Sequence, residues 1–319
     1  MLDVHRLRLL RELSRQGTIA AAARVCSLTP SAVSQQLAVL EREAGTPLYF
    51  RDGRRLVLTE AARVLVEHTE HVLAELERAR ASVAALTSTV RGVLRLAAFP
   101  TAARVLAADA IARCRAAHPD LRVRLSEQET ADAVESLRGG RIDVALVYEY
   151  SLLPAVREPA VETEPLLTEP LLLALPPGLA AGAGPLELAS LADQPWIAAS
   201  QDDALHQMLA RACAAAGFAP RLDFTSSDYT VIFALVRAGL GVSIVPRLAL
   251  ESMSADVALR PVAELELTRT VSAAVRAGSR RGPQIAAMLT ALHDVAAELP
   301  VTSGAADGST PVEGDDGGR

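Results

Sequence analysis

The sequence predicts three parts: an all-α winged helix-turn-helix at the N-terminus, a long linker helix, and an α/β region of two subdomains. Three observations support this. Residues 18–58 read as a short Ala-rich helix, a break, a two-faced helix and a basic hairpin. Residues 60–86 repeat apolar residues at heptad spacing. From Val93 onward, apolar strands and helices alternate, which is typical of parallel or mixed sheets covered by helices.

The second helix of the N-terminal part has two distinct faces. Val33, Leu37, Leu40 and Ala44 follow one another at intervals of three or four residues, so they share one side and can pack inward. The opposite side carries small or polar residues, namely Ser31, Ser34, Gln35, Ala38 and Arg42. Such a face can approach the base edges of DNA and hydrogen-bond them. An ordinary packed helix pair with a solvated polar face is the alternative.

The chain on either side of this helix also suits a nucleic acid. Thr29 is the expected N-cap, with Pro30 at the first helical position, so free N–H groups at the helix start can meet a phosphate. A hairpin is expected after the helix, because Asp52-Gly53 is a turn signal between two β-prone runs. Its turn is surrounded by Arg51, Arg54 and Arg55. Arginines beside a recognition helix are suited to backbone phosphates.

The charge distribution agrees with a nucleic-acid partner for the N-terminal part. Residues 1–60 hold nine arginines and six acidic residues, whereas the rest holds 23 and 32. A basic segment on an acidic protein indicates local binding of an anion.

A long helix is expected from Thr59, its N-cap, to the linker-like segment 87–92. Thr69, Leu76 and Val83 alternate with Val72, Ala79 and Leu86 in a heptad register. We expect a dimerising seam that comprises Val72, Leu76, Ala79, Val83 and Leu86. A core-facing helix of a globular domain is the alternative.

The α/β region is expected over residues 91–299. Strands are predicted at 93–99, 123–126, 143–148, 171–175, 196–199, 222–225 and 242–245, and helices at 101–117, 131–138, 205–216, 229–238 and 284–299. The chain is expected to return to the first subdomain around residues 262–275. Subdomain I would hold 91–160 and 262–299, and subdomain II 161–261. The winged helix-turn-helix would occupy 1–59 and the linker helix 60–90. The polar, Gly-rich tail 300–319 is expected to be disordered.

Several classes of protein lack support. Cys26, Cys114 and Cys213 have no metal-ligand or redox-motif spacing, and the His68 and His71 pair lacks a third ligand nearby. No nucleophile elbow or dinucleotide fingerprint occurs. We therefore expect no metal, no cofactor and no enzymatic activity. The charged N-terminus and the absence of a long apolar run predict a cytoplasmic protein without a membrane partner.

The motifs together resemble a known family. Residues 2–62 resemble the winged helix-turn-helix of LysR-type transcriptional regulators through TPSAVSQQL, LEREAG, PLYFR and RRLVLTEAA. The later words GVLRLAAFP, HPDLRVRL, LRGGRIDVALV, DQPWIA and RAGLGVSIVP extend the resemblance to about residue 297. The family often has Phe where Tyr49 stands and Gly where Ala62 stands.

The resemblance implies a function. A ligand-responsive regulator of this family binds promoter DNA as a homodimer, with a homotetramer also expected and RNA polymerase a further candidate partner. The DNA contacts carried over are Thr29, Pro30, Ser31, Ser34 and Gln35, with Arg51, Arg54 and Arg55 in the wing. The alternative is a cytoplasmic two-lobed small-molecule-binding protein or an enzyme with the same fold.

The resemblance also implies an effector region similar to periplasmic binding proteins, with a small molecule held between its two subdomains. Thr101 and Thr130 match family positions whose hydroxyls contact effectors. The apolar wall would come from Phe99, Pro100 and Tyr148, and the second subdomain would contribute Ser200, Gln201, Ser226 and Ser227. These residues include no arginine, so a small polar or weakly anionic effector is expected rather than a phosphate ester.

Overall fold

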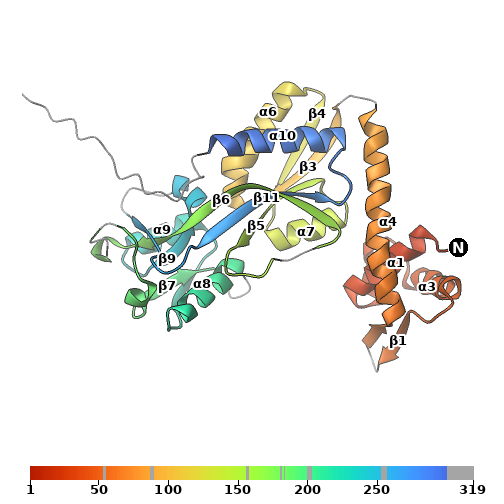
Figure 1. Ribbon diagram of the computed structural model, residues 1–319, viewed down its shortest axis with the longest axis horizontal. Coiled ribbons are helices and arrows are strands. Elements are labelled where there is room, and N and C mark those ends of the chain that lie inside the picture. The colour runs from red at the N-terminus through yellow and green to blue at the C-terminus, as the bar shows by residue number, and fades with distance from the viewer. Residues whose placement is uncertain are drawn as a thin grey trace, which may run out of the picture. The chain divides into compact units, whose positions relative to one another are not determined.

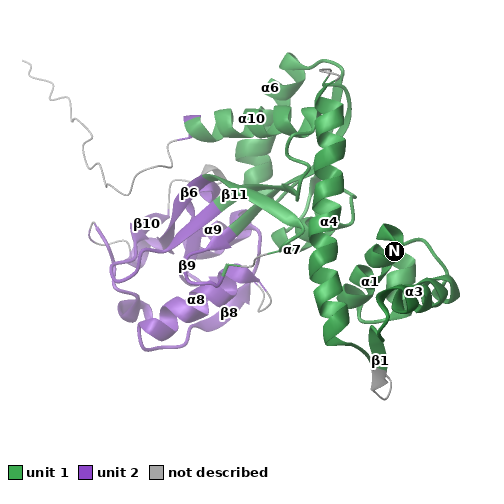
Figure 2. Ribbon diagram, turned by 45° about the vertical axis from the view of Figure 1, so that its right-hand side comes forward, with its two compact units in different colours: residues 1–148, 155–166, 271–297 green, residues 149–154, 167–270, 298–319 purple. Residues whose placement is uncertain are grey.

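The computed structural model describes residues 1–52, 55–86, 90–155, 158–179, 182, 184–199, 203–252 and 257–299. The chain divides into two compact units (Figure 2). Unit 1 holds residues 1–148, 155–166 and 271–297, and unit 2 holds 149–154, 167–270 and the chain from 298.

Unit 1 begins with three short helices, a hairpin and a long helix (Figure 1). In chain order these are α1 Val4–Gln16, α2 Ile19–Val25, α3 Pro30–Ala44, β1 Tyr49–Asp52, β2 Arg55–Leu58 and α4 Glu60–Ala85. The expected caps are confirmed, because the Thr29 hydroxyl accepts the Ala32 N–H at 3.2 Å and the Thr59 hydroxyl accepts the Ala62 N–H at 3.3 Å. Ser27 lies at φ 55°, a left-handed conformation that separates α2 from α3.

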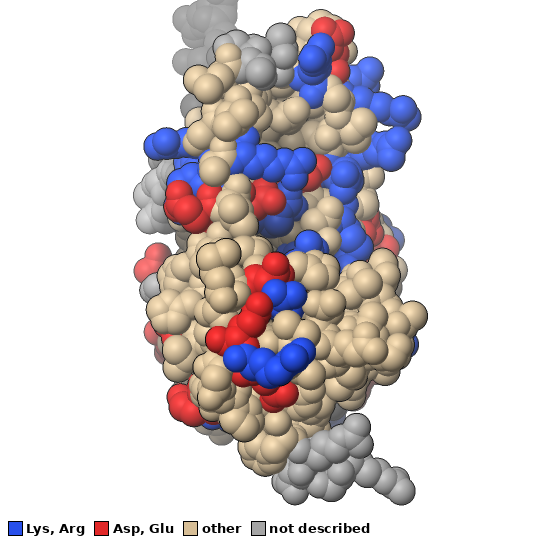
Figure 3. Space-filling model, turned by 90° about the vertical axis from the view of Figure 1, so that its right-hand side faces the viewer, with Lys and Arg blue, Asp and Glu red and all other residues tan. Residues whose placement is uncertain are grey.

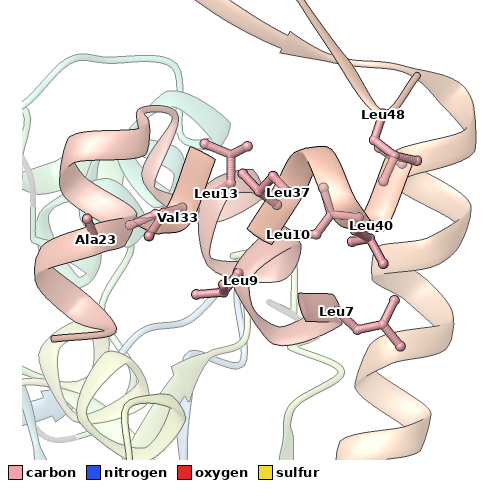
Figure 4. Packing of buried hydrophobic residues seen from close by; sticks show 11 residues of the cluster. Leu7, Leu9, Leu10, Leu13, Ala23, Val33, Leu37, Leu40 and Leu48 are labelled. Carbon is pink, nitrogen blue, oxygen red and sulfur yellow. The ribbon is translucent and has the colours of Figure 1, made fainter. Parts of the chain in front are cut away.

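The N-terminal helices enclose one apolar core (Figure 4). Val33, Leu37 and Leu40 of α3 are fully buried, which confirms the predicted inward face. Their partners include Leu10 and Leu13 of α1, and α2 presents the small residues Ala22 and Ala23, which allow close packing. The core thus determines which side of α3 is left for solvent.

The remaining part of unit 1 is a parallel sheet with helices. Strand β3, Gly92–Ala98, pairs in parallel with β4, Leu121–Glu127, and with β5, Val144–Tyr150. The helix predicted at 101–117 is α5 Pro100–Ala102, a π-helical segment Ala103–Ala107 and α6 Ala108–Ala117. Helices α7, Thr130–Arg138, and α10, Pro283–Glu298, complete this part. The three strands end at the same edge of the sheet.

Strands β6, Val161–Leu175, and β11, Thr268–Arg276, pass through both units. In unit 2, β6 pairs antiparallel with β9, Ser243–Pro246, and with β10, Ala258–Pro261. A separate parallel pair is formed by β7, Pro195–Ala198, and β8, Arg221–Thr225. The helices are α8 Ala204–Ala215 and α9 Tyr229–Arg237, and 3₁₀ turns span Pro177–Leu179, Leu188–Leu191 and Arg247–Ser252.

One expectation about these strands differs from the structure. The predicted strand 171–175 is only the end of β6. The prediction missed residues 161–170 because they are rich in Glu and Thr and contain two prolines. The boundaries between the two units fall inside β6 and β11, and the main segment of unit 2 is 167–270. The expected subdomain II, 161–261, stays a prediction.

Unit 2 contains a buried ion pair that the sequence did not indicate. Glu169 of β6 and Arg269 of β11 meet at 2.6 Å, and their side chains are 0% and 2% exposed. The Leu248 N–H also donates to the Glu169 carboxylate at 2.6 Å. Burial raises the pKa of Glu169, while the Arg269 guanidinium acts in the opposite direction. The pair ties together the two strands that pass between the units, and removal of either partner would leave a buried charge uncompensated.

Candidate nucleic-acid interface and effector site

The outward side of α3 carries the predicted DNA-contacting residues. Thr29, Pro30, Ser31 and Gln35 are exposed, and Ser34 is half-buried. The Thr29 and Ser31 hydroxyls lie 3.0 Å apart at the helix start. Small polar groups and free N–H groups therefore occupy the exposed side and the start of this helix, as reading of a major groove requires.

The β1–β2 hairpin, the predicted wing, is anchored to α3. The Leu48 N–H donates to the Glu41 carboxylate at 2.9 Å, and the Thr59 hydroxyl donates to the Pro47 carbonyl at 2.9 Å. Phe50 is exposed on β1. Arg54 and the side chains of Arg51 and Arg55 lie outside the described residues, so their predicted phosphate contacts stay predictions.

Helix α4 has one buried and one exposed side. Four members of the predicted seam, Val72, Leu76, Val83 and Leu86, are 38% to 83% exposed, and Ala79 is exposed as well. Thr69 does not continue this seam, because it is buried and its hydroxyl donates to the Leu65 carbonyl at 2.6 Å. The exposed apolar stripe thus begins at Val72.

Ion pairs connect the buried side of α4 to its surroundings within unit 1. Arg15 of α1 contacts Glu70 of α4 at 2.7 Å and Glu158, in the segment before β6, at 3.3 Å. Arg138 of α7 also contacts Glu158, at 3.3 Å. Burial lowers the pKa of Arg15, aided by the nearby Arg11 guanidinium. These contacts join the helix-turn-helix to the α/β part of the same unit.

The predicted effector residues of unit 1 gather at the carboxyl ends of the parallel strands. Phe99 and Tyr148 stack edge-to-face with ring centroids 4.8 Å apart. The Tyr148 N–H donates to the Thr130 hydroxyl oxygen at 3.1 Å. Thr101 is buried, whereas Pro100 is exposed. Ligands of open α/β sheets bind outside this end of the strands.

The sequence reasoning missed two polar residues at the same edge. The Tyr148 hydroxyl donates to the Glu129 carboxylate at 3.0 Å. The side-chain oxygen of Gln128 is buried, and none of the described residues donates a hydrogen bond to it. Both residues directly follow β4, a position that could have indicated them. They add hydrogen-bond acceptors and a negative charge to the edge.

The structure says less about the effector contacts that were predicted from the second subdomain. Ser200 and Gln201 lie outside the described residues. In unit 2, the Ser226 hydroxyl oxygen accepts the Asp228 N–H at 3.1 Å, and Asp228 in turn caps α9 through the Thr230 N–H. Ser226 therefore organises the start of α9, and Ser227 next to it is exposed.

All three cysteines have thiols that resist ionisation. Cys114 and Cys213 are buried and Cys26 is partly buried. Burial raises the pKa of each thiol, and that of Cys213 rises to about 12. Within the described part of the chain, no cluster of His, Cys, Asp or Glu could hold a metal ion, and no helix has the length and hydropathy to cross a bilayer.

Family models match most of the chain. The bacterial regulatory helix-turn-helix of the lysR family matches residues 4–63, and the LysR substrate binding domain matches residues 87–297. This chain therefore belongs to the LysR family of DNA-binding transcription regulators. The family resemblance and the fold class predicted from the sequence are confirmed.

Similar proteins carry different regulatory names. A probable hydrogen peroxide-inducible genes activator from Mycobacterium avium is 30% identical over 245 residues, which cover 76% of this chain and 77% of that protein. The transcriptional regulator GalR from Pseudomonas putida is 28% identical over 301 residues, which cover 93% and 75%.

Solved structures share the fold. A full-length OxyR variant from Pseudomonas aeruginosa matches with a TM-score of 0.59 at 22% identity, covering 92% of this chain and 95% of that one. CbnR in complex with its target DNA matches with a TM-score of 0.53 at 23% identity, covering 92% and 100%.

The thiol environments predict that hydrogen peroxide does not switch this protein. The thiolate is the form that attacks peroxide, and a pKa of about 12 leaves roughly one in 10⁵ Cys213 thiols ionised at pH 7. DNA binding should be the same before and after a modest excess of peroxide, in the wild type and in a triple Cys→Ser variant. Mass spectrometry should find all three thiols reduced; a sulfenic acid or a disulfide would contradict this.

Proposed function

We propose that this protein reads a promoter sequence through α3 as a homo-oligomer and responds to a small-molecule effector bound at the β3–β4–β5 edge. The observation that carries the proposal is the division of α3 into a fully buried apolar side and an exposed polar side. Membership of the LysR family supports it.

In this proposal the contacts on DNA divide into two kinds. Ser34 and Gln35 hydrogen-bond base edges, because their short or flexible polar side chains lie on the outward side of α3. Arg51, Arg54 and Arg55 hold phosphates, because a guanidinium attracts the negative charge of the DNA backbone. Such contacts position the protein and carry no sequence information. The Thr29-Pro30-Ser31 start of α3 faces the backbone of the same groove.

Substitutions should separate these two roles. Gln35→Ala should relax discrimination at one base pair by about 1–3 kcal/mol and leave the salt dependence unchanged. Arg54→Ala should weaken binding to every sequence and flatten the salt dependence. The DNA for these measurements is the sequence that the wild type selects from a random pool, together with its single-base variants. Titrating each variant protein with these DNAs at several salt concentrations gives the base discrimination and the salt dependence. A uniform loss for Gln35→Ala would contradict the assigned role.

The exposed stripe of α4 is the proposed dimer contact. Val72, Leu76, Ala79, Val83 and Leu86 keep heptad spacing on the side that unit 1 leaves uncovered. A second copy of α4 would cover them and present two α3 helices to two half-sites. The family resemblance supports a homotetramer built from two such dimers and a contact with RNA polymerase.

An aspartate in this stripe should prevent pairing. Leu76→Asp places an unpaired charge in an apolar contact, so sedimentation should detect more monomer and titration weaker binding to paired half-sites. His71→Asp is the matched control, since His71 is exposed on α4 outside the stripe. Equal oligomeric states for the two variants would argue against the seam.

The effector proposal rests on the edge formed by Phe99, Thr101, Thr130 and Tyr148. Glu129 and Gln128 supply acceptor oxygens there, and none of the residues named at this edge is basic. We infer a small polar effector that donates hydrogen bonds, instead of the weakly anionic one that the sequence allowed.

Removal of the hydroxyls should test this edge. A thermal-shift screen of polar metabolites should find donor-bearing compounds that raise the Tm of the wild type. Thr101→Val with Thr130→Val should reduce their affinity at least tenfold and leave DNA binding without ligand unchanged. Thr290→Val, an exposed threonine on α10, is the control. Unaltered affinity in the double variant would place the effector elsewhere.

A further inference from the structure

One arginine of α1 holds α3 at two points. The Arg6 guanidinium donates to both carboxylate oxygens of Glu43, at 3.0 and 2.7 Å, and to the side-chain oxygen of Gln36 at 3.3 Å. The Arg6 and Glu43 side chains are only 22% and 19% exposed. Figure 3 shows the side of the molecule on which these helices lie, where blue and red side chains meet near the middle of the mostly tan lower half.

The start of α1 holds this guanidinium in place. Asp3 caps α1 by accepting the Arg6 N–H at 3.1 Å, and its carboxylate also lies 3.9 Å from the Arg6 guanidinium. The hydrogen bonds from Arg6 lower the pKa of Glu43, so the carboxylate stays ionised at neutral pH. A two-point contact between guanidinium and carboxylate fixes orientation as well as distance.

The spacing of the two contacts determines which motion they oppose. Gln36 and Glu43 are seven residues apart, about two helical turns, so they lie on the same side of α3. Each directly follows a residue of the outward side, Gln35 or Arg42, at a rotation of about 100°. Contacts at two heights on one side oppose rotation of α3 about its axis. The apolar core opposes it less, because hydrophobic contact has no preferred direction.

We propose that Arg6 is a positioning residue for DNA recognition, which sets the rotation of α3 so that Ser34 and Gln35 meet base edges. The proposal rests on the reading role of α3 given above. A rotation of roughly 15° at a radius of about 6 Å moves a side-chain tip by about 1.6 Å, enough to break a hydrogen bond. Phosphate contacts tolerate the same shift, because the attraction between charges falls slowly with distance.

The experiment compares Arg6→Met with Arg63→Met. Arg63 forms an exposed pair with Glu60 on α4, so the control removes the same charge from an ion pair that does not touch α3. The measurement is the ratio of affinities for the sequence selected by the wild type and for random-sequence DNA, at several salt concentrations. Arg6→Met should lower this ratio at least tenfold without changing the random-sequence affinity or the salt slope. Arg63→Met should leave the ratio unchanged.

Two further variants distinguish positioning from folding. Gln36→Met removes one of the two contacts and keeps the Arg6–Glu43 pair, so it should lower the ratio less than Arg6→Met does. The exchange Arg6→Glu with Glu43→Arg should restore part of the ratio lost in Arg6→Met. Thermal unfolding of each variant identifies any that fail to fold, in which case Gln36→Met decides.

Three outcomes would contradict the proposal. Equal losses for both DNAs with a shallower salt slope would make Arg6 a phosphate contact. An unchanged ratio of selected to random affinity in folded Arg6→Met or Gln36→Met would mean that the contact between Arg6 and α3 only stabilises the fold. If the wild type itself selects no sequence, the proposed reading role of α3 fails, and the role of Arg6 fails with it.

Discussion

The N-terminal domain depends on the burial of Val33, Leu37 and Leu40 against α1 and α2. Each buried leucine contributes about 1.5–3 kcal/mol, so the side of α3 that carries them faces inward. The polar side is then exposed as a consequence. Hydrophobic burial thus selects the exposed side, while directional contacts from Arg6 and Glu41 fix the helix and the wing more finely.

Helix α4 belongs to two environments at once. Thr69, Glu70 and Ala81 are buried within unit 1, where ion pairs to Arg15 compensate the buried carboxylate of Glu70. The other side leaves a stripe of apolar residues in water, which costs free energy unless a partner covers it. The same helix therefore carries contacts within unit 1 on one side and the proposed dimer contact on the other.

Family membership does not fix what a member of the family senses. Similar proteins are named for hydrogen peroxide or for other regulatory roles, and a shared fold can hold different sites. In this chain burial raises the pKa of all three cysteine thiols, which lowers the fraction present as reactive thiolate. The edge beside Tyr148 instead offers a carboxylate, an amide oxygen and hydroxyls. This edge is where we propose that the effector binds, and its chemistry differs from that of a reactive thiol.

The sequence by itself determined what depends on neighbours along the chain. The caps Thr29 and Thr59, the inward face of α3 and the exposed stripe of α4 follow from spacings of a few residues, where helix geometry is fixed. The tertiary structure decided contacts between distant residues. Arg6 meets Glu43, Glu129 meets Tyr148 and Glu169 meets Arg269 across 37, 19 and 100 positions. No local pattern encodes such pairs, because they form only when packing brings their helices and strands together. Residues 161–170 of β6 also escaped prediction, since these polar residues gain a strand conformation from pairing with neighbours in the sheet.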